Sequence, residues 1–369
     1  MRFFATAAKG TEPALRDELR ELRMPRVRAD RGGVHFEGEM SDAARACLWS
    51  RVAARVLLEV TSFEAGSEEG LYAGVHDVDW TAWMTAKTTM AVRASCKSSR
   101  LTHTQFIAQK TKDAVVDSLR DRLGERPSVD REDPDVLLAV HLLRDRATVY
   151  LDVGGASLHE RGWRTEAGVA PLRETLAAAV VRLSGWDRDR PFVDPMCGAG
   201  TLAIEAAGWA HRVAPGLTRD RFGLERWASH DDARRQVMKE LREGARAERT
   251  VEGPPVFASD ASPKAAQIAA ENARRAGVPV VVDRRAVRDL EPLRPPGFVV
   301  TNPPYGERLD ADADLYAELA GAMRHMRGHT IALLAGTPAI GRAMRGKPER
   351  FHVLYNGPIE CRLLVYTIR

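Results

Sequence analysis

Four consecutive residues in the last quarter of the chain, Asn302-Pro303-Pro304-Tyr305, could together hold a planar amine. They follow the apolar run "FVV", which is typical of a buried strand, and two prolines without backbone N–H groups stop the strand from continuing. The side-chain oxygen of Asn302 and the carbonyl oxygen of Pro303 could each accept one N–H of the amine. Tyr305 could stack on the attached ring. The alternative is an ordinary Pro-Pro turn with a core tyrosine.

A second candidate site precedes it in the segment "VDPMCGAGTLAIEAA". Asp194 ends an expected strand, Gly198 and Gly200 form a turn, and Thr201 starts an expected helix. Ligands of open parallel sheets bind at the carboxyl ends of strands, where glycines and helix N–H groups let them approach the backbone. Asp260 ends the next expected strand, at a spacing typical of a carboxylate that binds ribose hydroxyls.

The charge of Asp194 bears on which ligand this loop would take. Residues 198–203, "GAGTLA", also fit the dinucleotide pattern G-x-G-x-x-A, so the loop alone leaves NAD open. A carboxylate at position 194 would repel a pyrophosphate. It would suit a cation, such as the amine or sulfonium of S-adenosylmethionine.

The segments "DPMCGAG", "SD", "RDL" and "TNPPY" resemble the class I S-adenosylmethionine-dependent methyltransferases, and among them the NPPY subclass that methylates amino groups. The resemblance implies that Asp194 and the two glycines bind the methionine part of the cofactor, Asp260 the ribose and Asp289 the adenine amine. Cys197 is expected to be a small packed residue, since this chemistry has no thiolate step. The implied cofactor-binding set is Asp194, Pro195, Cys197, Gly198, Gly200, Thr201, Asp260, Ala261 and Asp289; the implied catalytic set is Asn302, Pro303, Pro304 and Tyr305.

The N-terminal half carries a further resemblance. "FFATAAKGTEPALRDELREL", "RGGVHFEG" and "VYLDVGGASLHERGWR" are similar to the ferredoxin-like and THUMP regions of RNA methyltransferases. With "NGPIEC", the whole chain resembles the N-terminal half of the large-subunit (23S) ribosomal RNA guanine-N2-methyltransferases. This implies an RNA partner, ribosomal RNA first and transfer RNA second. Left open are a DNA adenine-N6 or protein glutamine methyltransferase, and a non-catalytic RNA-binding protein.

The composition fits this reading and excludes some classes. The 369 residues are more than one core usually holds, and the net charge is +4, from 55 basic and 51 acidic side chains. No apolar run approaches the roughly 20 residues of a membrane span, and no signal peptide is evident. The four cysteines form no CxxC pair and the histidines have no ligand spacing, so we expect a reducing, cytoplasmic location and no metal.

The expected fold class is α/β, in four parts. Residues 1–60 should form a ferredoxin-like α+β region and residues 61–155 a THUMP-like RNA-binding domain with a hairpin turning near "RDR". Residues 156–190 should form a linker with a docking helix. Residues 191–369 alternate strands and helices, which predicts a Rossmann-like parallel sheet whose last strand is antiparallel. Within them, residues 211–250 are rich in charge and are expected to be a helical, surface-exposed insertion. The oligomeric state stays open.

Overall fold

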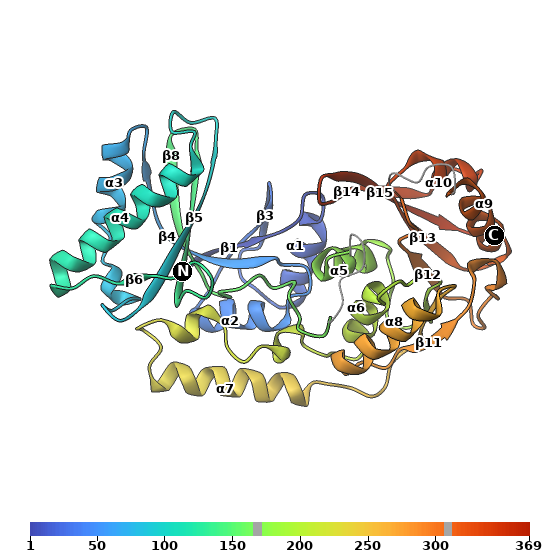
Figure 1. The fold of residues 1–369 in the computed structure, drawn as a ribbon. Helices are drawn as coiled ribbons and strands as arrows, with labels where there is room; N and C mark the ends of the chain where they lie inside the picture. The colour runs from blue at the N-terminus through green and yellow to red at the C-terminus, as the bar shows by residue number, and fades with distance from the viewer. Residues whose placement is uncertain (165–171, 306–311) are drawn as a thin grey trace.

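The computed structural model of the protein describes residues 1–164, 172–305 and 312–369 and contains two β-sheets (Figure 1). The predicted first turn around Pro171 and the residues "GERL" after Tyr305 lie outside the described residues. No helix within the described ranges is long and apolar enough to cross a membrane.

The first sheet has eight strands in the order β2-β3-β1-β4-β8-β7-β5-β6. Its strands are β1 (Arg2–Thr6), β2 (Arg28–Asp30), β3 (Gly33–Glu37), β4 (Arg55–Glu64), β5 (Thr89–Lys97), β6 (Ser128–Val129), β7 (Val136–Leu143) and β8 (Arg146–Asp152). The long strand β4 pairs with β1 on one side and with β8 on the other. The expected ferredoxin-like and THUMP-like parts therefore share one sheet, and the boundary expected at residue 60 falls inside a strand that belongs to both.

The helices of this half are α1 (Glu12–Glu21), α2 (Met40–Trp49), α3 (Glu68–His76) and α4 (Thr104–Leu123). The predicted hairpin is confirmed: β7 and β8 are antiparallel, with Arg144 and Asp145 between them at φ of 51° and 61°. Along β7, the alternate residues Leu138, Val140 and Leu142 are buried, as a strand with one core face requires.

The second sheet has seven strands in the order β11-β10-β9-β12-β13-β15-β14. They are β9 (Phe192–Asp194), β10 (Val256–Asp260), β11 (Val281–Arg284), β12 (Phe298–Thr301), β13 (Thr330–Ala335), β14 (Arg350–Asn356) and β15 (Ile359–Thr367). The strands β9 to β13 are parallel and β15 is antiparallel to β13, as predicted. Strand order reverses at β9, which lies between β10 and β12. Such a reversal is where open α/β sheets bind ligands.

The helices of the second half are α5 (Glu174–Leu183), α6 (Thr201–Ala210), α7 (Asp232–Ala247), α8 (Pro263–Ala276), α9 (Asp312–His325) and α10 (Pro338–Ala343). Helix α5 belongs to both hydrophobic cores: Ala178 and Ala179 pack in the core of the first half, and Ala177 and Val180 in that of the second. The expected docking helix is thus a shared wall between the two halves.

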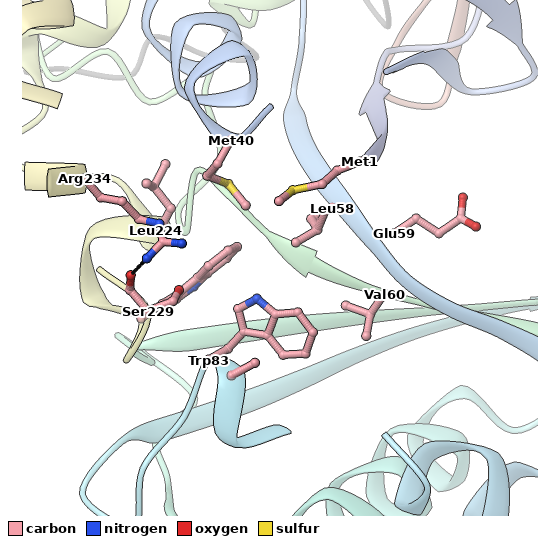
Figure 2. Close-up of a pocket in the computed structure, with 11 residues that line it drawn as sticks. Met1, Met40, Leu58, Glu59, Val60, Trp83, Leu224, Ser229 and Arg234 are labelled. Atoms are coloured by element: carbon pink, nitrogen blue, oxygen red, sulfur yellow. Dashed lines mark hydrogen bonds between the residues drawn. The ribbon is translucent and has the colours of Figure 1, made fainter. Parts of the chain in front are cut away.

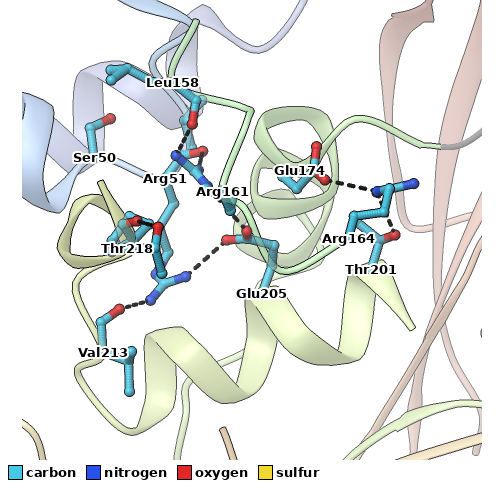
Figure 3. Close-up of polar contacts among 12 residues, drawn as sticks. Ser50, Arg51, Leu158, Arg161, Arg164, Glu174, Thr201, Glu205, Val213 and Thr218 are labelled. Atoms are coloured by element: carbon cyan, nitrogen blue, oxygen red, sulfur yellow. Dashed lines mark hydrogen bonds and ion pairs between the residues drawn. The ribbon is translucent and has the colours of Figure 1, made fainter. Parts of the chain in front are cut away.

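A buried ion-pair cluster joins the two halves beside α6 (Figure 3). Glu205 of α6 accepts from Arg51 Nη1 at 2.9 Å and pairs with Arg161 Nε at 3.5 Å. Arg161 in turn donates to the carbonyl oxygen of Arg51 at 2.7 Å. Gly208 leaves the room that this needs, because a Cβ there would lie 2.8 Å from the Arg51 guanidinium. The cluster fixes the helix that follows the glycine loop.

The insertion at residues 211–250 is only partly as predicted. The predicted exposed helix is confirmed for α7, which is largely exposed. The expected surface exposure is wrong for the segment before it. Phe222, Leu224 and Trp227 are buried there, and the backbone N–H of Leu224 donates to Val153 O at 3.0 Å. Residues 222–227, called the strap below, therefore bury their apolar side chains despite the charged neighbours. They connect the second half to the first sheet.

Candidate active site

The carboxyl ends of three neighbouring strands bring the predicted residues together. Asp194 ends β9, Asp260 ends β10, and Asn302 follows Thr301 at the end of β12. Thr301 Oγ1 donates a hydrogen bond of 2.7 Å to Asp194 Oδ1, which links the glycine-loop strand to the strand before Asn302. The two predicted motifs therefore form one site.

Asp194 is a buried carboxyl group, 1% exposed, with unusual proton affinity. Burial raises its pKa to about 7, and the nearby Asp260 carboxylate adds to the rise. The hydrogen bonds from Thr301 and from the backbone of Met196 lower the pKa but do not cancel that effect. Among the described residues, none of the groups that shift this pKa is a cation. The site therefore suits a positively charged ligand.

The glycine loop is held by β10 and α8. Asp260 accepts from Gly198 N at 3.0 Å and from Ser262 N at 2.9 Å. Asn272 of α8 donates to Ala199 O at 3.0 Å. Gly200, at φ 82°, approaches α8 closely, whereas a Cβ added at Gly198 would meet nothing within 4 Å. The loop is thus held in place on the side of β10 and α8, and it borders open space at Gly198.

Thr201, at the start of α6, is linked to an arginine that the sequence analysis did not assign. Arg164 Nη2 donates to Thr201 Oγ1 at 3.0 Å, and Arg164 Nε pairs with Glu174 at 3.0 Å (Figure 3). The buried Nη1 of this arginine has no hydrogen-bond partner within the described ranges. Arg164 lies in the segment "ERGWR". Nothing in its spacing to the glycine loop indicates from the sequence that it contacts Thr201.

The other predicted cofactor residues occupy different environments. Pro195 and Cys197 are buried, and burial raises the pKa of the Cys197 thiol, which fits a packed, unreactive residue. Ala261 is exposed. Asp289 is exposed at the end of a short 3₁₀ turn after β11, and within the described ranges no hydrogen bond joins its side chain to the loop. Its role stays a prediction.

Asn302 has an unmet acceptor. Its Oδ1 atom is buried and has no hydrogen-bond partner among the described residues. Pro303 is buried and Pro304 is exposed. The carbonyl oxygen of Pro304 is already taken by the hydroxyl of Tyr316, at 2.7 Å. Residues 302–305, called the amine clamp below after the role predicted for them, thus present an amide oxygen that has no partner in the described part of the chain.

Tyr305 is anchored at its hydroxyl and packed at its ring. The hydroxyl accepts from Asn356 Nδ2 at 2.9 Å and from Cys361 Sγ at 3.6 Å, both in the β14–β15 hairpin. A Cβ at Gly336 would lie 2.3 Å from the ring, so only glycine lets the ring pack there. Burial raises the pKa of this tyrosine above its ordinary value. Sequence reasoning missed these anchors, although "NGPIEC" carries both hairpin residues.

No cluster of three or more His, Cys, Asp or Glu side chains within the described ranges could hold a metal ion.

Three family models match the chain in succession. They are the RlmL ferredoxin-like domain over residues 2–57, the THUMP domain over residues 65–152 and the RMKL-like methyltransferase domain over residues 161–364. Relatives called "Ribosomal RNA large subunit methyltransferase K/L" are 43% identical in Syntrophotalea carbinolica and 44% identical in Methylococcus capsulatus. The alignments cover 100% and 99% of this chain but 54% and 51% of the relatives. The chain spans about half the length of these curated relatives.

Solved structures agree over the full length. SMU.472, solved as a complex with SAH, aligns with TM-score 0.89 and 31% identity, over 100% of this chain and 98% of that one. A predicted N6-adenine-specific DNA methylase from Listeria monocytogenes also aligns with a TM-score of 0.89 and 31% sequence identity. The alignment covers 99% of this chain and 95% of that one. TrmN from Thermus thermophilus shares the fold, with a TM-score of 0.70 and 21% sequence identity over 99% of this chain and 98% of that one. With its three successive domain matches, the chain belongs to the RMKL-like methyltransferase family.

Proposed function

We propose that the chain is an S-adenosylmethionine-dependent methyltransferase that acts on the exocyclic N2 amine of a guanosine in large-subunit ribosomal RNA. The observation that carries this proposal is the buried Oδ1 of Asn302, which has no hydrogen-bond partner among the described residues and lies one residue beyond the Thr301 hydroxyl that contacts Asp194. A buried oxygen that can accept an amine N–H, beside a carboxyl group that favours a cation, fits the methylation of an amine by a sulfonium cofactor. The names of the relatives support the RNA substrate.

The residues at the strand ends fit the cofactor by their chemistry. No described cation shifts the pKa of the buried Asp194 carboxyl group, the Gly198 backbone borders open space, and Asp260 keeps lone pairs for ribose hydroxyls. We assign the same region, with Pro195, Cys197, Gly200, Thr201 and Ala261, to cofactor binding and Asp289 to the adenine amine. When bound, S-adenosylmethionine supplies an electrophilic methyl group on a sulfonium.

The chain's own task is to hold the amine. A guanine N2 amine is a poor nucleophile because its lone pair is delocalised into the ring. Asn302 Oδ1 and the Pro303 carbonyl oxygen would each accept one N–H, which directs the lone pair out of the ring plane. Pro303 and Pro304 restrict the backbone that aims this carbonyl, and Tyr305, anchored by Asn356, borders the ring. No tuned base is needed, since the proton can leave after transfer.

A methyl-transfer assay tests the activity. Labelled cofactor would be incubated with the purified chain and, separately, ribosomal RNA, transfer RNA and DNA, and the products digested to nucleosides for mass spectrometry. We expect N2-methylguanosine from ribosomal RNA. The main alternative is DNA adenine-N6 methylation, favoured by the name of the Listeria monocytogenes neighbour, because the same clamp fits either amine. N6-methyladenine in DNA, or label in transfer RNA alone, would overturn the corresponding part of the proposal.

A further inference from the structure

A hollow of about 410 Å³ lies outside the strand-end site, where the segment before α7 crosses the first sheet (Figure 2). It is lined by side chains from five stretches of the chain, one of which is the N-terminal Met1. Met40 and Leu58 come from α2 and β4, Trp83 from the turn before β5, and Trp227 and Arg234 from the insertion. None of these residues belongs to the strand-end site. The volume lies within the range of known ligand pockets.

The walls of the hollow are fixed without a ligand. The Trp83 ring packs against the buried Trp80, with centroids 6.1 Å apart, and the Trp83 carbonyl accepts from Ala228 N at 2.9 Å. On the strap side, Leu224 N donates to Val153 O at 3.0 Å. A preformed hollow costs little ordering entropy on binding, so it favours a ligand more than a gap between mobile side chains would.

The lining combines aromatic faces with a cation. Trp83 is half-buried and Trp227 is buried, and the Trp227 Nε1–H has no acceptor within the described ranges. Figure 2 shows Met1 and Met40 on one side of the hollow, the Trp83 indole on the other, and Arg234 reaching in beside Leu224. Arg234 is exposed and uses Nη1 on Ser229 O and Asp231 Oδ2. Asp231 thus pairs with the Arg234 guanidinium through Nη1, while Nη2 and Nε make no hydrogen bond within the described ranges. An indole face and a guanidinium edge that line the same hollow are the chemistry that binds a nucleobase and its phosphate.

We propose that this hollow binds one unpaired base of the RNA, with the base stacked on Trp83 and an adjoining phosphate near Arg234. The proposal rests on the proposed function only for its ligand, RNA. An apolar peptide would use the methionine and leucine wall but would give Arg234 no role. The hollow would thus add an anchor point on the RNA away from the base that receives the methyl group.

Binding measurements on the full chain test the inference. The dissociation constants of a single-stranded RNA and of a fully paired RNA duplex of the same length would be measured by fluorescence anisotropy at fixed salt, without cofactor. We expect Trp83→Leu to weaken binding of the single strand roughly ten-fold, with little effect on the duplex, because only an unpaired base can stack there. Trp83→Phe keeps a ring and should restore most of the loss. Phe351→Leu is the matched control, since Phe351 is an exposed aromatic on the distant β14.

Arg234→Gln provides a second arm that does not disturb packing, because this side chain is exposed. It should weaken single-strand binding several-fold and reduce the slope of log affinity against log salt by roughly one contact. If Trp83→Leu and Arg234→Gln matched the control, or if Trp83→Leu weakened both RNAs equally, the base assignment would be wrong. If the unaltered chain bound neither RNA, the proposed RNA substrate itself would fail.

Discussion

The glycine loop and the amine clamp lie on adjacent strands but differ in how their polar atoms are satisfied. In the loop, Asp260 accepts two backbone N–H groups and Ala199 O is taken by Asn272, so the chain itself meets these hydrogen-bonding groups. In the clamp, Asn302 Oδ1 is buried and lacks a partner among the described residues. A buried polar atom left in that state costs roughly 1–3 kcal/mol. Around the loop, the buried atoms without a partner among the described residues are Asn272 Oδ1 and Arg164 Nη1, which belong to side chains that hold the loop in place. In residues 302–305, the buried atom without such a partner is the side-chain oxygen that is expected to accept from the amine.

Removing that open acceptor should give the largest effect. Asn302→Ala is expected to lower methyl transfer roughly a thousand-fold, because the amine loses an orienting contact, and to leave the cofactor dissociation constant nearly unchanged. The free energy of unfolding should not fall, since no described residue hydrogen-bonds to the lost amide oxygen. Methyl-transfer kinetics, isothermal titration and thermal melting measure the three quantities. A loss of cofactor affinity as large as the loss of rate would contradict the clamp assignment.

Changes in the loop should show the opposite pattern. Asp260→Ala removes the acceptor of Gly198 N and a candidate ribose ligand, so we expect the cofactor dissociation constant to rise roughly a hundred-fold. At saturating cofactor the rate should be largely retained. Asn272→Ala is the matched asparagine control for Asn302→Ala: it loosens Ala199 and should weaken cofactor binding by a smaller factor. Unchanged cofactor affinity in Asp260→Ala would remove Asp260 from the cofactor site.

Ionisation of Asp194 should make cofactor binding depend on pH. Its pKa in the folded, unliganded chain is about 7, above the ordinary value of 3.8 for an aspartate. Raising pH through 7 ionises it, so cofactor affinity should rise up to about ten-fold between roughly pH 6 and pH 8. The folded state binds this proton more tightly than the unfolded state. Its contribution to unfolding free energy is therefore fully present below about pH 4 and is lost as pH rises to 7.

Isothermal titration at both pH values, with Asp194→Asn as control, separates this effect from other titrations. The variant cannot ionise and should bind the cofactor more weakly with a flatter pH profile. An equally steep profile in Asp194→Asn would assign the pH dependence to another group.

The smallest expected effect concerns the tyrosine anchor. Asn356→Ala removes the 2.9 Å hydrogen bond to the Tyr305 hydroxyl and should lower the rate several-fold while cofactor affinity stays the same. Asn356→Asp should recover most of the rate, because the hydroxyl can then donate to the carboxylate. Steady-state kinetics on ribosomal RNA measure both variants. Equal rates for the two would make the contact merely structural.

Sequence reasoning found the features that depend on local pattern. Alternating apolar residues predicted the hairpin around Arg144, and an apolar strand followed by a glycine-containing segment predicted the loop after Asp194. It missed contacts between residues far apart in the chain, such as Asn356 with Tyr305 and Arg51 with Glu205, since no local period signals them. It also took the buried strap around Leu224 for surface, because the apolar residues there are outnumbered by charged neighbours.

The ion-pair cluster around Glu205 has a consequence for synthesis on the ribosome. Arg51 and Arg161 emerge before Glu205, the carboxylate that pairs with both in the finished fold. Until α6 is made, both guanidinium groups lack this partner, and Arg51 also lacks the second-half groups that bury it, Gly208 and the carbonyl oxygen of Val213. A truncated chain ending at residue 164 also lacks Ala178, Ala179 and Phe222 of the first core, so it should bind chaperones or aggregate, and the N-terminal half should reach its final packing only when the next half has been translated.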